Sequence, residues 1–310
     1  MADANINGIT ISYEASGNPA KPAVLLNMGL GLQLVSWPPA FVEGLVEMGY
    51  YVIRYDNRDA GLSSKFDHLG APRLWLAYLK TLAGLKLKAA YTLQDMAADA
   101  CGLLSYLGIP RAHIIGVSMG GMVSQIFAAR YPKRTLSLTS IMSSSGRPGL
   151  PGPTPAARRV LLSSSPPAGT REQLIEYMAN TFKVIGSPAY PMPEAYVREM
   201  CSRAVDRNVH PDGASRQLVA IVASGDRSKL LRSLQCPALV IHGTDDPLVP
   251  AACGIDTAEQ IPGARLELIE GMGHDLPPQL IGRLHALIGS HMEGKMVAPQ
   301  PSPADYLEQD

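Results

Sequence analysis

The chain has few cysteines and no net charge, and both facts narrow its range of functions. No two cysteines form a Cys-x-x-Cys pair, and the four are Cys101, Cys201, Cys236 and Cys253. This spacing argues against a structural zinc site and against a disulfide framework. The 27 basic and 27 acidic residues balance, so the sequence has no electrostatic footprint for nucleic acid and we expect no such partner.

Long apolar runs are also missing. No stretch of about 18 or more apolar residues is present, so we expect no stable membrane insertion. Residues 1–13 include neither a basic segment nor a long apolar run, which predicts no signal peptide and a cytoplasmic location. With 310 residues, the chain is long enough for one α/β core with an added helical segment. Composition leaves the oligomeric state open.

The sequence does contain a serine between two glycines. Residues 116–120 read Gly-Val-Ser-Met-Gly, after an apolar run at 112–115 and before a helical pattern that continues to Tyr131. In the nucleophile elbow of serine hydrolases, a turn this tight requires glycine at positions such as Gly116 and Gly120 and lifts the hydroxyl, here that of Ser118, into a pocket. The pattern alone also fits an ordinary Gly-Ser turn, so its context must distinguish the two.

Short apolar runs alternate with helical patterns along the chain. The spacing predicts helices near residues 41–48 and 93–107 and strands at 23–26, 51–55, 112–117, 136–141, 237–241 and 265–269. Such alternation predicts a mostly parallel sheet with helices on both faces. Ligands of these sheets bind beyond the carboxyl ends of the strands.

Residues suited to acyl transfer follow three of these strands. Ser118 follows one, Asp245 and Asp246 follow another, and His274 follows the last on a glycine-flanked loop. This chain order of serine, acid and histidine is that of α/β-hydrolases. Since a serine hydroxyl is a poor nucleophile until a base accepts its proton, His274 is the predicted base.

These motifs resemble the α/β-hydrolase superfamily over roughly residues 5–291, and they are found at residues 27–31, 54–63, 116–121, 242–247 and 271–274. Within it, the chain is most similar to bacterial carboxylesterases related to the aclacinomycin methylesterases. The resemblance implies an α/β-hydrolase fold: a mostly parallel, eight-stranded twisted sheet with helices on both faces and an inserted helical lid. It also implies a reaction that needs no metal and no cofactor.

The resemblance assigns the acid that orients His274. The superfamily pattern has this acid three residues after Gly243, which identifies Asp246. Asp245 is the rival, and Asp275 is a weaker alternative because it neighbours the histidine in sequence.

The resemblance also implies two backbone N–H groups that bind an oxyanion. One is that of Met119, at the start of its helix. The other is that of Leu30, which follows Met28-Gly29 where relatives have His-Gly. Asp56, Arg58 and Asp59 are expected to brace this loop through ion pairs and to take no part in catalysis.

The chain divides into four expected segments: a hydrolase core at 1–146 with a helical insertion at about 64–91, a helical lid at 147–233, the second part of the core at 234–293, and a mobile tail at 294–310. The lid shows helical patterns near 154–164, 171–185, 194–207 and 213–223. Its aromatic and methionine residues either line a pocket or form the lid core. In the first insertion, an apolar face with Trp75 and Leu79 is expected to pack against the lid.

The leading hypothesis is a carboxylic-ester hydrolase that forms an acyl-serine intermediate on a small-to-medium or methyl ester, with a small-molecule ester as its partner. Perhydrolysis and carbon–carbon bond hydrolysis use the same three residues and remain alternatives. A non-catalytic ligand-binding receptor on this fold is the alternative from another class.

Overall fold

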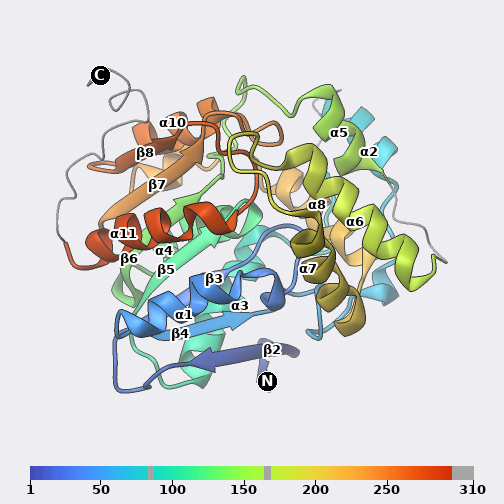
Figure 1. Ribbon diagram of the computed structural model, residues 1–310. Coiled ribbons are helices and arrows are strands. Elements are labelled where there is room, and N and C mark those ends of the chain that lie inside the picture. Colours follow the sequence, from blue (N-terminus) through green and yellow to red (C-terminus); the bar gives the residue numbers. More distant parts are fainter. Residues whose placement is uncertain (83–84, 86, 164–168, 295–310) are drawn as a thin grey trace, which may run out of the picture.

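The computed structural model describes residues 1–82, 85, 87–163 and 169–294. Its centre is an eight-stranded sheet with the order β1-β2-β4-β3-β5-β6-β7-β8 (Figure 1). The strands are β1 Ala2–Ile6, β2 Ile9–Ser16, β3 Ala23–Asn27, β4 Tyr51–Tyr55, β5 Ala112–Val117, β6 Thr135–Ile141, β7 Ala238–Gly243 and β8 Arg265–Ile269. Only the β1–β2 and β2–β4 pairs are antiparallel, which confirms the expected mostly parallel sheet.

Helices cover both faces of this sheet because the central strands are buried on both sides. In β3, Val24 and Leu26 pack with α1 (Pro39–Glu47) and α11 (Ile281–Met292). Leu25, which points to the opposite face, packs in a second cluster with residues of two other helices, α3 (Leu93–Tyr106) and α4 (Met119–Arg130). Helix α10 (Ala251–Gln260) contacts β7 and β8. The alternation of side chains along a strand therefore divides the core into two layers.

The first two strands were not predicted individually. They form a hairpin in which Ile6 pairs with Ile9, and the two turn residues, Asn7 and Gly8, have φ values of 50° and 77°. Positive φ at both positions is typical of a type I′ turn, for which Asn-Gly is a favoured dipeptide. This dipeptide was the available signal in the sequence.

A helical insertion separates β6 from β7. Its helices are α5 Pro155–Leu162, α6 Arg171–Ile185, α7 Glu194–Arg207, α8 Pro211–Ser224 and the short α9 Ser228–Leu231. The first four agree with the helical patterns in the sequence. In Figure 1, α6, α7 and α8 lie together beside the sheet.

The charged turn after β4 joins this insertion to the core. Asp56 pairs with Arg207 of α7 at 2.6 Å, and Asp59 receives two 2.8 Å hydrogen bonds from Arg216 of α8. The other Asp56 oxygen accepts from the Leu34 N–H at 2.7 Å, just beyond the loop at 28–31. These contacts fit the structural role expected for the turn.

The first insertion differs from its prediction. In the described residues of this insertion there is one α-helix, α2 (Leu74–Leu82), and it contacts α8. Trp75 and Leu79, expected to pack against the lid, are instead 62% and 52% exposed. Helical spacing predicted the helix but did not determine whether another element covers its apolar face.

The expected mobile tail lies outside the described residues from position 295 onward. Within the described part of the chain, no helix combines the length and apolar character needed to cross a membrane.

Candidate active site

Ser118 occupies a strained turn between β5 and α4. Its φ is 54° and its ψ is −122°, a conformation that is costly for a residue with a side chain. The two flanking glycines make the turn possible. A Cβ on Gly116 would lie 2.2 Å from the Gly120 carbonyl oxygen, and a Cβ on Gly120 would lie 2.1 Å from the Asn27 carbonyl oxygen. The sequence prediction that this turn excludes side chains therefore has a direct steric basis.

Gly120→Ala is expected to lower the free energy of unfolding by about 3 kcal/mol, because the added methyl group meets fixed backbone. Gly282→Ala is the matched control, since a Cβ on this helical glycine meets nothing within 4 Å. The control should change stability by less than about 1 kcal/mol, in the stabilising direction. Urea unfolding of both variants measures this, and equal stabilities would contradict the steric account.

The structure brings Ser118, His274 and Asp246 together from three separate strand ends. His274 Nε2 lies 2.9 Å from Ser118 Oγ, and His274 Nδ1 lies 2.7 Å from Asp246 Oδ2. All three side chains therefore form one hydrogen-bonded line, in which the imidazole lies between the hydroxyl and the carboxylate. The histidine and the aspartate are 7% and 4% exposed, so water has little access to the pair.

Asp246 is held in its charged form. Burial alone would raise the pKa of this carboxyl group, but the nearby His274 charge and hydrogen bonds from His242, His274 and the Val249 N–H outweigh it and hold the pKa well below its usual value. The other carboxylate oxygen accepts from the Leu248 and Val249 N–H groups at 2.9 and 2.8 Å. The carboxylate is thus both ionised and fixed in orientation.

The two rival aspartates lie elsewhere. Asp245 is exposed and accepts a 2.9 Å hydrogen bond from the Thr244 hydroxyl. Asp275 is buried but hydrogen-bonds to Ser187. Of the three candidates, Asp246 is the one in hydrogen-bond contact with the His274 imidazole.

His242 packs against the acid. Its fully buried ring lies against Gly254, where an added Cβ would come within 2.2 Å of Nδ1. Nε2 is 2.7 Å from the Val249 carbonyl oxygen and 3.5 Å from Asp246 Oδ2. The ring therefore packs directly behind the carboxylate.

The loop that carries His274 is anchored to the end of α6. The His274 N–H donates to the Ile185 carbonyl at 2.7 Å, and the Gly273 N–H donates to Ser187 Oγ at 2.8 Å. Ser187 in turn donates to Asp275. No sequence pattern linked these two segments, which are more than 80 positions apart.

Ser187→Ala is expected to destabilise the protein by about 2 kcal/mol at neutral pH, because it removes a donor to a buried carboxylate. Burial raises the pKa of Asp275 despite the opposing hydrogen bonds from Ser187. An acid whose folded pKa is raised loses stability as pH rises through that pKa, and the variant raises it further. Unfolding at pH 7 and at about pH 4 should therefore show the larger deficit at pH 7. Ser187→Thr is the control, and a deficit independent of pH would contradict this account.

The two backbone N–H groups expected to bind an oxyanion belong to segments that adjoin Ser118. A Cβ on Gly29 would lie 3.3 Å from Ser118 Cβ, so the loop after β3 runs directly beside the serine. Among the described residues, the N–H groups of Leu30 and Met119 have no hydrogen-bond acceptor. The loop is fixed by a 2.8 Å hydrogen bond from the Gly31 N–H to Gln217 and one of 3.1 Å from Asn57 to the Met28 carbonyl.

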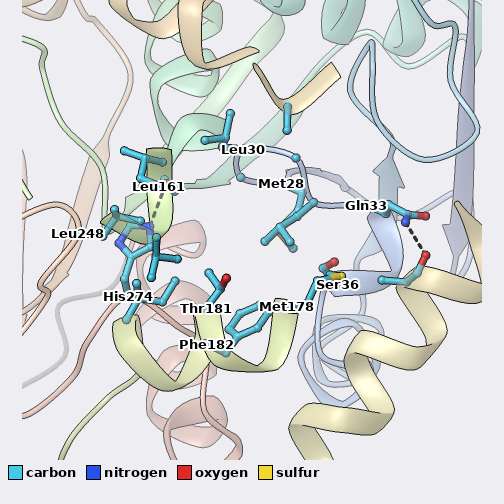
Figure 2. A pocket seen from close by; sticks show the side chains of 18 of the residues that line it. Met28, Leu30, Gln33, Ser36, Leu161, Met178, Thr181, Phe182, Leu248 and His274 are labelled. Atoms are coloured by element: carbon cyan, nitrogen blue, oxygen red, sulfur yellow. Dashed lines mark hydrogen bonds between the residues drawn. The ribbon is translucent and has the colours of Figure 1, made fainter. Parts of the chain in front are cut away.

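A cavity of about 600 Å³ opens beside these groups. Figure 2 shows His274 and Leu248 on one side of it, Gln33 and Ser36 on the opposite side, and Met178, Thr181 and Phe182 of α6 along a third. The wall is mostly apolar, as is usual for a site that binds a small organic molecule.

The aromatic and methionine residues of the insertion do not divide cleanly between the two expected roles. Those that line the cavity are Tyr177, Met178, Phe182, Met192 and Met200. Tyr190 packs instead against the core cluster that contains residues of α1 and α11. Four of the lining residues also pack against one another within the insertion, so one set of side chains forms both the core of the insertion and part of the cavity wall.

A mostly parallel sheet with a Gly-x-Ser-x-Gly turn after a central strand, and a histidine and an acid after later strands, is the arrangement typical of α/β-hydrolases. A family model described as alpha/beta hydrolase fold matches residues 22–278, so the chain belongs to this family.

Several characterised proteins are similar to the chain over nearly its full length. It is 29% identical to the rhodomycin D methylesterase DauP of Streptomyces sp. (strain C5), over 93% of this chain and 97% of DauP. The rhodomycin D methylesterase DnrP of Streptomyces peucetius matches with the same identity and coverage. The enol-lactonase from Burkholderia xenovorans LB400 has a similar structure, with a TM-score of 0.72, 24% identity, and coverage of 94% of this chain and 100% of that one.

Proposed function

We propose that the protein is a carboxylic-ester hydrolase that forms an acyl intermediate on Ser118. The observation that carries the proposal is the continuous hydrogen-bonded line from Ser118 Oγ through the His274 imidazole to Asp246. This is the geometry that converts a serine hydroxyl into a nucleophile.

In the first half of the reaction, His274 Nε2 accepts the Ser118 proton as Oγ attacks the ester carbonyl carbon. Asp246 keeps the proton-bearing Nδ1 directed toward itself and stabilises the imidazolium that forms. The negative charge on the carbonyl oxygen is stabilised by the N–H groups of Leu30 and Met119. His274 then donates its proton to the departing alcohol oxygen, which leaves Ser118 acylated.

In the second half, a water molecule takes the place of the alcohol. His274 accepts its proton, the hydroxide attacks the acyl carbon, and the serine leaves with the proton returned from the imidazole. The products are a carboxylic acid and an alcohol.

The substrate we propose is the methyl ester of a bulky, largely apolar carboxylic acid. A cavity of about 600 Å³ accommodates an acyl group far larger than acetyl, and its wall is mostly apolar. Relatives that match almost the whole chain are methylesterases, which supports methanol as the leaving group.

A substrate panel tests this proposal. Methyl esters of polycyclic or long-chain acids should be hydrolysed with a higher kcat/KM than methyl acetate, and a fluorophosphonate probe should label Ser118. Turnover of a vinylogous diketone alone would instead support carbon–carbon bond hydrolysis. Complete inertness toward the probe and all esters would support a binding protein.

A further inference from the structure

Exposed apolar side chains are frequent in the segment that contains α2. Of the thirteen large apolar side chains that are exposed among the described residues, five lie between positions 69 and 85. They are Leu69, Trp75, Leu76, Leu79 and Leu85, with exposed fractions between 37% and 62%. Single exposed apolar residues are ordinary, but a cluster of this kind marks an interaction surface. We refer to these five residues as the α2 face.

The same stretch is positively charged although the chain as a whole is neutral. Between Asp67 and Asp95 the sequence has no acidic residue, and its basic residues are Arg73, Lys80, Lys86 and Lys88. Arg73 and Lys88 are exposed. A partner that fits this surface must therefore be apolar and negatively charged at once.

The α2 face also borders the cavity that contains Ser118. Leu74, the first residue of α2, lines that cavity and is followed directly by the exposed Trp75. The neighbouring helix α8 contributes Leu218 to the same cavity wall. Whatever covers the α2 face thus lies next to the substrate site.

We propose that the α2 face docks the protein onto an anionic lipid surface. Trp75 and Leu79 would enter the headgroup region, where tryptophan is favoured, and the exposed Arg73 and Lys88 would neutralise lipid phosphates. An apolar anchor combined with a basic segment supplies the two signals that stable peripheral binding requires. Apolar esters of the size that the cavity accepts partition into lipid, so docking would bring the site to its substrate.

Charge argues against the main alternative, a second copy of the chain. Two α2 faces packed together would oppose positive charges across one interface, which disfavours association. The chain's own C-terminal segment is the other acidic candidate, since it contains Asp305, Glu308 and Asp310. Vesicle binding and the oligomeric state in solution distinguish a lipid surface, a second copy and the C-terminal segment as occupants of the α2 face.

The two tryptophans of the chain provide a direct probe. Trp37 is fully buried and Trp75 is 62% exposed, so a blue shift of the emission on vesicle binding reports Trp75. We expect full-length protein to bind vesicles of phosphatidylcholine with phosphatidylglycerol about tenfold more tightly than phosphatidylcholine alone. Added salt should weaken the binding. Trp75→Phe should abolish the blue shift while co-sedimentation with the vesicles persists.

Leu79→Ser and Lys88→Glu should each weaken vesicle binding by about tenfold. The matched controls are Leu268→Ser on β8, where the leucine is 38% exposed, and Lys133→Glu, where the lysine is exposed, and both should bind like wild type. Hydrolysis of soluble esters should be unchanged in Leu79→Ser, so failure of the docking proposal is separable from failure of the proposed function.

Three results would overturn the docking proposal. The first is absent binding, or equal binding to neutral and anionic vesicles. The second is a dimer in solution that Leu79→Ser dissociates, which would assign the face to a second copy. The third is vesicle binding that appears only in the full-length variant with Asp305→Asn, Glu308→Gln and Asp310→Asn, which would assign the face to the C-terminal segment.

Discussion

Ser118→Ala is expected to lower kcat for ester hydrolysis by about 10⁵ to 10⁶, the largest effect that any single substitution in this chain should have. The substitution removes the atom that forms the covalent bond, and no neighbouring group replaces it. His274 loses its proton donor, and the N–H groups of Leu30 and Met119 stabilise only the slow attack of water. The residual rate should still exceed that of the uncatalysed reaction.

Ser36→Ala is the matched control for this variant. Ser36 lines the same cavity on the side opposite His274 (Figure 2), so its replacement should leave kcat within the same order of magnitude. Intact mass measurement after a brief reaction with a fluorophosphonate adds a second readout. Labelling of wild type and Ser36→Ala, with none in Ser118→Ala, is the expected pattern. Retention of most activity by Ser118→Ala would remove the serine from the reaction.

Asp246→Asn is expected to lower kcat by about 10⁴ while the fold is retained. The asparagine is nearly isosteric, but it removes the charge that stabilises the imidazolium and places an amide where the carboxylate received the Nδ1 hydrogen bond. Because the serine, the cavity and the two backbone donors are unchanged, KM should change little. Steady-state kinetics and thermal unfolding together measure both parts of this prediction.

Asp245→Asn separates the two adjacent acids. Asp245 is exposed and bonds to Thr244, so its amide variant should hydrolyse esters at nearly the wild-type rate. A large loss of kcat in Asp245→Asn with a small loss in Asp246→Asn would show that the acid had been assigned to the wrong residue.

Much of the fold and the main chemistry could be predicted because their signals are local. The apolar runs of the central strands are continuous in sequence, and Gly116 and Gly120 flank the serine they serve. The acid was assigned to Asp246, three residues after Gly243, through the family resemblance. The residues that determine each of these local features lie within a few positions of one another.

The features that sequence reasoning missed depend on long-range packing. Ser187 and Asp275 are 88 positions apart, and nothing near either residue indicates the other. The pairing of Arg216 with Asp59 spans 157 positions. The exposure of Trp75 has the same origin, because helical spacing specifies an apolar face but not which element, if any, covers it.

The attachment of the histidine loop to residues 185–187 has a consequence for engineering. Segments inserted between β6 and β7 are attractive units to transplant when a new substrate range is wanted. If this insertion were replaced by that of another protein, the chain would lose the Ile185 carbonyl and the Ser187 hydroxyl, which hold residues 273 and 274 in place. A chimera that preserves these two anchor points should keep its turnover, whereas a seamless exchange of the whole insertion should misalign the general base even when the new binding pocket is well formed.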